Sequence, residues 1–276
     1  MLAGCRTGGA RQVSEDGAPT GGESASAGKE PVSAGKELVL TIPGPGKVKL
    51  RMKEIPAGTF AMGSPKGEKG REQREGPMHQ VVISKPFHMG VFEVTQAQWE
   101  AVMGTNPSEF NGKPANPVER VSWKECQEFV EKLNGMGIGT FRLPTEAEWE
   151  YACRAGTRTA YSFGGDASKL KEYANHDATP KYGDKSTAPV GGLRPNPWGL
   201  YGMHGNVYEW CCDWYATYSR DKQTDPSGAA FGSFRVLRGG CWRDSSGACR
   251  SALRGARSPS IQSTRYYGFR LVREVQ

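Results

Sequence analysis

Thiols are the side chains of this sequence with the widest range of chemistry, because cysteine binds soft metals, forms disulfides and acts as a nucleophile. The 276 residues contain seven cysteines. That is too few for a domain built on disulfides, and none shows the CxxC spacing of a zinc site, so we assign no metal to them. Cys126 and Cys153 fall on the apolar faces of expected helices, where buried, unreactive thiols are typical. The other thiols within the expected domain are Cys211, Cys212, Cys241 and Cys249.

Histidines are the other common source of metal ligands and of acid–base catalysis. The sequence has four, at His79, His88, His176 and His204. None stands at the spacing of a metal ligand pair or beside a nucleophile, and surface or loop positions are the simpler interpretation. We therefore expect no catalytic constellation from these side chains.

The basic residues point to no particular partner by themselves. A formal net charge of +7 is a modest excess, for which a solvated basic surface is the usual meaning. Nine of the 20 arginines lie from Arg235 onward, with tyrosines among them. No lysine accompanies these arginines, unlike an ordinary phosphate-binding patch, so nucleic-acid binding is not favoured.

Three segments carry the chemistry of a helix start, a hydroxyl residue followed three positions later by Glu or Gln. The second segment continues with apolar residues at 126, 129, 130 and 133, which places them on one helical face. We predict three short helices, of which the first ends at Gly104 and the third at Gly156. The pairs are Thr95 with Gln98, Ser122 with Glu125, and Thr145 with Glu148.

The rest of the chain predicts short strands joined by long loops. Gly (37) and Pro (18) make up about a fifth of the sequence, so turns and irregular connections must be frequent. Seven tryptophans are available to anchor those loops. We predict a loop-rich α+β domain with short helices and short antiparallel strands. The expected strands are Leu38 to Ile42, Val48 to Met52, Val81 to Ser84, Phe234 to Leu237 and Phe269 to Val272.

The N-terminal segment differs in composition from the rest. Met1-Leu2-Ala3-Gly4-Cys5 resembles the end of a bacterial lipoprotein signal, in which a cysteine after small residues receives lipid. Residues 6–36 contain no aromatic residue and cannot bury enough apolar surface to fold, so they predict a flexible tether. Since no run of about 18 apolar residues exists, we expect membrane attachment only through lipid on Cys5. We divide the chain into a lipobox remnant (1–5), the tether (6–36) and one domain (37–276).

Several motifs of this domain resemble the formylglycine-generating-enzyme, or sulfatase-modifying-factor, family. They occur in the family's order over roughly residues 40 to 275 and are highly specific. The resemblance implies a variant of the C-type-lectin fold. The motifs begin at Ile55 (IPAGTFAMGS), Val91 (VFEVTQAQWEAVMG), Asn116 (NPVERVSW), Phe141 (FRLPTEAEWEYACRAGT), Gly205 (GNVYEW), Arg235 (RVLRGGCW) and Gly268 (GFRLV).

The same resemblance argues against the family's oxidase chemistry. The oxidases resemble one another in having two copper(I)-binding cysteines, four and nine positions after a Gly-Gly pair. Counted from Gly240, those positions hold Asp244 and Cys249. A carboxylate is a hard ligand that does not replace a thiolate on copper(I), and Cys241 stands at the wrong position. The alternative interpretation is that the chain is a copper oxidase or another enzyme of this family, with Cys241 and Cys249 as its reactive thiols.

The family's calcium loop is similar to the segment around Gly205. Asn206 and Glu209 match its ligands, whereas Gly202 stands where the family has an amide or acid. Calcium is thus a candidate cofactor at Asn206 and Glu209, although none is required. The other interpretation is that both side chains only hydrogen-bond the loop.

The C-terminal segment has an unusual composition. Lys, Glu, Gln, Met and Trp make up 61 of the 276 residues, yet Gln262 is their only member between Arg243 and Val272. The runs 243–248, 253–258 and 260–267 otherwise use residues reachable by changing the adenines of an Asn codon. This resembles the variable region of proteins diversified by a retroelement, such as the variable lipoproteins of treponemes.

Interchangeable residues must lie on a surface and not in the core, held by anchors such as Trp242, Arg250, Arg254, Phe269 and Arg270. We therefore predict a variable ligand-binding region at about 241–267 of a non-catalytic protein displayed on a bacterial cell surface as an outer-membrane lipoprotein. Its partner would be a protein or another surface ligand. The candidate ligand-binding residues are Cys241, Arg243, Asp244, Ser245, Ser246, Gly247, Leu253, Gly255, Ala256, Arg257, Ser258, Ser260, Ile261, Ser263, Thr264, Arg265, Tyr266 and Tyr267.

Overall fold

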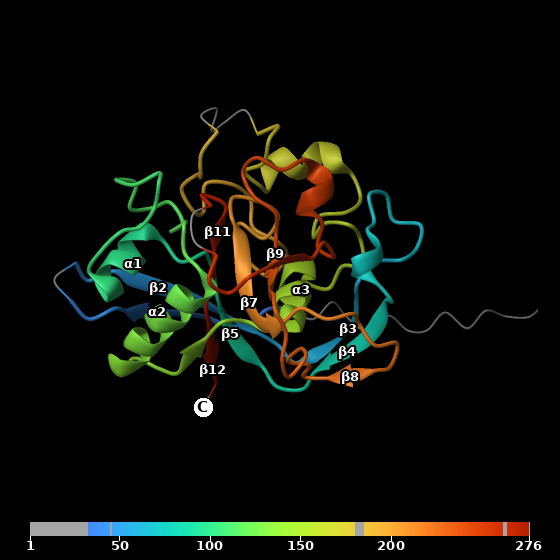
Figure 1. Ribbon diagram of the computed structural model, residues 1–276, viewed down its shortest axis with the longest axis horizontal. Helices are drawn as coiled ribbons and strands as arrows, with labels where there is room; N and C mark the ends of the chain where they lie inside the picture. The colour runs from blue at the N-terminus through green and yellow to red at the C-terminus, as the bar shows by residue number, and fades with distance from the viewer. Residues whose placement is uncertain (1–32, 45, 180–184, 262–263, 276) are drawn as a thin grey trace, which may run out of the picture. The chain divides into compact units, whose positions relative to one another are not determined.

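The computed structural model describes residues 33–44, 46–179, 185–261 and 264–275, which belong to one compact unit (Figure 1). The predicted lipidation site Cys5 and most of the predicted tether lie outside the described residues. Within the described part, no helix is long and apolar enough to cross a membrane.

The largest sheet joins strands from both ends of the described chain. Its order is β1-β2-β5-β12-β6, and every neighbouring pair is antiparallel. The last strand, β12, lies between β5 and β6, so the C-terminus is held inside the sheet. The strands are β1 (Glu37–Thr41), β2 (Lys49–Ile55), β5 (Phe87–Gly90), β6 (Phe141–Arg142) and β12 (Val272–Glu274).

A second sheet supports the C-terminal segment, in the order β10-β9-β7-β11. A third sheet has the strand order β3-β4-β8. Most strand pairs are antiparallel, as predicted, but β11 runs parallel to β7 and β8 runs parallel to β4. The strands are β3 (Gly58–Met62), β4 (His79–Ile83), β7 (Tyr208–Trp214), β8 (Gln223–Thr224), β9 (Arg235–Arg238), β10 (Gly255–Arg257) and β11 (Tyr267–Gly268).

The three predicted helix starts are confirmed. The helices α1 (Gln96–Met103), α2 (Trp123–Gly135) and α3 (Glu146–Arg154) each begin with a complete capping box. α1 ends at Gly104 in the left-handed conformation, as expected, whereas α3 ends one residue early because Ala155 adopts that conformation. Short 3₁₀ turns complete the helical content of the described part: η1 (Gln73–Glu75), η2 (Ala167–Glu172) and η4 (Ser246–Cys249).

The predicted strand from Phe269 to Val272 was largely wrong. Only Val272 belongs to a strand, because residues 269–271 lead from β11 in the second sheet to β12 in the first. Their backbone is still bonded, since Phe269 O accepts from Val94 N and Leu271 O accepts from Gly90 N. An apolar run thus connects two sheets through the core.

The core consists of packed aromatic and aliphatic side chains, as the tryptophan content predicted. Trp99 stacks on Phe129 of α2, and the Phe269 ring meets both edge-on. Trp149 and Trp210 are fully buried. Because these rings come from α1, α2, α3, β7 and the C-terminal segment, they tie distant parts of the chain to one core.

Candidate functional site

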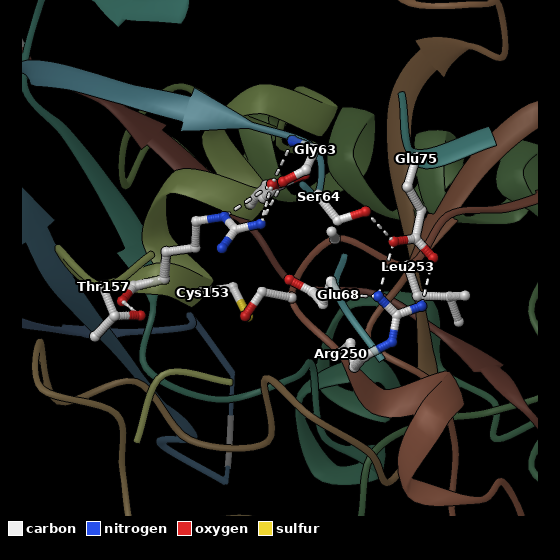
Figure 2. Close-up of polar contacts among 12 residues, drawn as sticks. Gly63, Ser64, Glu68, Glu75, Cys153, Thr157, Arg250 and Leu253 are labelled. Atoms are coloured by element: carbon white, nitrogen blue, oxygen red, sulfur yellow. Dashed lines mark hydrogen bonds and ion pairs between the residues drawn. The ribbon is translucent and has the colours of Figure 1, made fainter. Parts of the chain in front are cut away.

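The C-terminal segment rests on buried arginines that pair with glutamates far away in the sequence. Arg250 donates to Glu68 Oε1 at 2.6 Å and to Glu75 Oε2 at 2.7 Å, and it also bonds Gly70 O (Figure 2). Arg250 and Glu75 are 2% and 0% exposed on their side chains. The guanidinium lowers the pKa of Glu75 against the opposing effect of burial. This bidentate pair therefore fixes η4 to the η1 region.

Three further arginines repeat this arrangement. Arg254 binds both oxygens of Glu146 at 2.6 and 2.7 Å, and Arg270 binds both oxygens of Glu209 at 2.6 Å. Arg238 pairs with Glu150, and its other amino group bonds the carbonyl of Ala252. The predicted anchors Trp242, Arg250, Arg254, Phe269 and Arg270 are all buried, at 5% exposure or less. Buried side chains that are not ligand-binding candidates thus provide the main anchors of the segment's backbone.

Most of the described candidates are accessible. The exposed ones are Arg243, Ser245, Arg257 and Ser260; the partly exposed ones are Asp244, Ser246, Gly247, Gly255, Ala256, Ser258, Ile261, Thr264, Arg265 and Tyr266. We call these fourteen residues the C-terminal face. Ser263 lies outside the described residues.

Three candidates depart from the expected surface position. Cys241, Leu253 and Tyr267 are 2%, 4% and 7% exposed. The Tyr267 ring packs edge-on against Trp210 of β7, and its hydroxyl accepts a 2.9 Å bond from Arg257 Nε. Tyr267 belongs to β11, whereas Cys241 and Leu253 lie in connecting segments, and all three have buried residues next to them in the chain.

Aromatic and cationic side chains meet at one end of the C-terminal face. Arg243 Nη1 donates to the Tyr266 hydroxyl at 2.5 Å, and the Arg265 guanidinium lies 5.4 Å from the Trp242 ring and 5.8 Å from that of Phe110. Hydrogen bonds from Arg265 and Arg243 lower the pKa of Tyr266. The cluster therefore presents two guanidinium groups and the Tyr266 ring at the surface, next to the buried Trp242 ring.

Sequence reasoning missed two members of this cluster. Phe110 packs edge-on against Trp242, and Glu109 accepts a 2.9 Å bond from Arg265. They precede the C-terminal segment by more than 100 residues and carry no motif of their own. No local signal could have found them, because only the tertiary fold brings their loop to this face.

The thiols near Gly240 are buried. Cys241 and Cys249 are buried, and burial, reinforced by the nearby Asp244 carboxylate, raises the pKa of both. Asp244 Oδ2 accepts a 3.0 Å bond from the Cys241 amide, which fixes the carboxylate where the oxidases have a cysteine. A neutral buried thiol is a poor nucleophile and a poor ligand for a soft metal, so this geometry does not provide a thiolate pair.

The residues proposed for calcium have protein partners. Arg270 binds both Glu209 oxygens, and Trp149 Nε1 donates to Oε2 at 2.7 Å. Asn206 donates to Glu93 Oε1 and accepts from the Ala188 amide. With a guanidinium on its carboxylate, Glu209 does not fit a cation ligand, and the described residues hold no cluster of three or more His, Cys, Asp or Glu suited to a metal.

The Glu93 carboxyl group lies directly against Gly202. A Cβ on Gly202 would lie 2.4 Å from Glu93 Oε1, so the glycine is required by this carboxyl group. Glu93 is 1% exposed, and burial raises its pKa to about 7. The loop thus contains a buried carboxyl group supplied by the segment before α1.

Comparison with known proteins places these observations in a family. Residues 46–275 match the model described as sulfatase-modifying factor enzyme 1-like domain. A formylglycine-generating enzyme of Streptomyces coelicolor is 30% identical and aligns with 80% of this chain and 88% of its own length. The serine/threonine-protein kinase pkn1 of Chlamydia pneumoniae is 32% identical over 84% of this chain, which spans only 39% of that protein.

Solved structures agree with the family model. Treponema denticola variable protein 1 has a TM-score of 0.77 and 32% identity, with 87% of this chain and 99% of that chain covered. PvdO from Pseudomonas aeruginosa has a TM-score of 0.72 and 29% identity, covering 82% and 94%. The predicted fold class is confirmed, and the chain belongs to the sulfatase-modifying-factor family with its C-type-lectin-like fold.

Proposed function

We propose that the chain is a non-catalytic ligand-binding protein and that the C-terminal face binds the ligand. The main support for this proposal is that the side chains that anchor the C-terminal segment are buried, whereas residues of the C-terminal face are accessible. The four arginine–glutamate pairs and the buried rings hold the backbone, while Arg243, Ser245, Arg257 and Ser260 are exposed. Exposed positions of this kind tolerate exchange because they support no core contact.

The chemistry of the C-terminal face suits recognition of a protein or another surface ligand. Tyr and Arg are the residue types enriched at binding hot spots, and Tyr contributes a large contact area with few rotatable bonds. Tyr266, Arg243 and Arg265 already form one cluster around Trp242. A ligand that stacks on these rings and offers hydrogen-bond acceptors would use the cluster without rearrangement.

The same proposal includes retroelement diversification and display on a bacterial surface through lipid on Cys5. Its supports are the depletion of five residue types between Arg243 and Val272 and the likeness to a treponemal variable protein. Calcium is not needed by this function. An oxidase remains the competing function, because formylglycine-generating relatives are about as similar as the variable protein.

Sequencing the gene from independent isolates of the source bacterium tests the proposal. We expect amino-acid differences to concentrate on the fourteen residues of the C-terminal face, with Trp242, Arg250, Arg254 and Arg270 unchanged. The adjoining DNA should hold a near-identical template repeat that differs at adenines. Differences spread evenly over residues 37–276 would contradict the proposal.

A second experiment separates binding from catalysis. The purified protein is loaded with copper(I) and given a cysteine-containing peptide, and oxygen uptake is measured beside an active formylglycine-generating enzyme. We expect no uptake above the rate without protein, because the thiols are buried and neutral. Turnover that disappears in Cys249→Ser would favour the oxidase instead.

A further inference from the structure

A cavity of about 500 Å³ lies beside the third sheet, apart from the C-terminal face. Its lining residues belong to β3 and β4, to the start of α3, to the end of β7, to β8 and the loops on both sides of it, and to the C-terminal segment at Arg254. A volume of this size is within the range of small-molecule sites. The proposed function does not use this cavity.

One wall carries the buried carboxyl group of Asp213, which forms no ion pair within the described part of the chain. Asp213 is 4% exposed, and its Oδ2 accepts the Glu146 amide at 2.8 Å and the Cys212 thiol at 3.4 Å. No described residue donates a hydrogen bond to Oδ1, and no described Lys or Arg forms an ion pair with this side chain. Oδ1 lies beside Gly228, where an added Cβ would be 3.0 Å away.

The neighbouring carboxylate shows what Asp213 lacks. Glu146 receives two bonds from Arg254 and one from the Tyr218 hydroxyl at 3.0 Å, and these neighbours lower its pKa. The pKa of Asp213 shifts in the opposite direction, because burial raises it to about 7 and the negative charge of Glu146 adds to the shift. The ionised form of such a carboxyl group is stabilised when a cation or a strong hydrogen-bond donor reaches Oδ1.

A histidine adds a second acceptor to the same cavity. His79 is 8% exposed, and its Nδ1 lies 3.1 Å from Pro77 O. Because a carbonyl can only accept, Nδ1 carries the hydrogen and leaves Nε2 as an acceptor in the neutral ring. Among the described residues, none donates to Nε2. The ring packs 4.9 Å from that of Tyr218, which supplies an apolar wall.

We propose that this cavity binds a small organic amine, whose ammonium group donates to Asp213 Oδ1 and to His79 Nε2. Asp213 and His79 are nine-tenths buried and line one cavity, no described residue donates to Asp213 Oδ1 or to His79 Nε2, and the ring of Tyr218 suits a short carbon chain. An anion would meet the uncompensated carboxyl group and a neutral alcohol would leave it without a cation, so neither fits as well.

Calorimetric titration with putrescine tests this proposal, with 1,4-butanediol as the uncharged molecule of the same length. We expect putrescine to bind one site saturably with a Kd of about 1 mM or below and to raise the Tm, and butanediol to bind at least about tenfold more weakly. Absence of saturation by about 20 mM putrescine, or equal binding of the diol, would overturn the proposal.

Two variants locate the site. Asp213→Asn retains an oxygen that accepts the Glu146 amide, and we expect it to fold yet to bind putrescine at least about tenfold more weakly. Asp225→Asn is the matched control, because Asp225 lines the same cavity but its oxygens already accept from Ser84. We expect its affinity to stay within about threefold of the wild type. Equal affinity in folded Asp213→Asn and in wild type would refute the assignment, whatever the C-terminal face binds.

Discussion

Replacing Arg250 by methionine tests whether this buried arginine holds the C-terminal segment in place, without changing any residue of the C-terminal face. The change removes the cation from two buried or nearly buried carboxylates, Glu75 and Glu68, while keeping an unbranched side chain up to the position of Nε. It also removes the bond to Gly70 O. The hydrogen bonds to Glu75 from Ser64 and from the Glu72 amide remain. The perturbation is thus confined to one guanidinium.

Removing one partner of a buried ion pair costs about 3 to 5 kcal/mol, since the remaining charge is left without compensation. A Glu75 side chain at 0% exposure has no route to solvent, which places this site toward the upper part of that range. For a domain of this size each kcal/mol shifts the Tm by about 2 to 4 °C, so a fall of about 6 to 20 °C is expected.

The assay is thermal unfolding followed by circular dichroism at several pH values. In the wild type Arg250 lowers the pKa of Glu75, so the stabilisation is present above its unfolded pKa and is lost as the pH falls through the folded one. In Arg250→Met the guanidinium no longer opposes burial, so we expect burial to raise that pKa against the remaining hydrogen bonds from Ser64 and Glu72, and Glu75 to bind a proton in mild acid. The Tm difference between the two proteins should therefore narrow from pH 7 to about pH 4.

Arg243→Met is the matched control, because it removes an exposed arginine of the same segment. We expect its Tm within about 2 °C of the wild type. The reasoning is wrong if Arg250→Met loses less than about 3 °C at pH 7, or if its deficit stays constant with pH. Either result would mean that the pair does not hold the segment.

Three further predictions address other parts of the structure. Thr145→Ala removes the cap of α3 and should lower the free energy of unfolding by about 1 kcal/mol in urea titration, with exposed Thr224→Ala unchanged as control. Burial raises the pKa of Glu119 to about 7, so its contribution is favourable in acid and is lost as the pH rises through 7. From pH 5 to pH 8 the free energy of unfolding of Glu119→Gln should therefore rise by about 1 to 3 kcal/mol relative to that of the wild type. Parallel curves of unfolding free energy against pH for the two proteins would contradict this. Millimolar calcium should not raise the Tm through Glu209, which Arg270 already binds; a rise that disappears in Glu209→Gln would restore the calcium prediction.

Local sequence determined the helix starts and the presence of a distinct C-terminal segment. Thr95, Ser122 and Thr145 satisfy backbone donors only three residues away, so their chemistry is complete within one helical turn. The depletion of five residue types from 243 onward is a property of composition and needs no structure. Motifs that occur in order along the chain also identified the family.

Tertiary structure alone decided which residues of the C-terminal segment are accessible. Leu253 and Tyr267 belong to the same depleted runs as Arg257 and Tyr266, yet the first two are buried beneath the others. The glutamate partners of Arg250 and Arg254 lie more than 100 residues away, and the Glu146 amide that donates to Asp213 lies 67 residues away. Spacing along a chain specifies neighbours within a turn or a strand, whereas burial and ion pairing depend on which distant elements pack together.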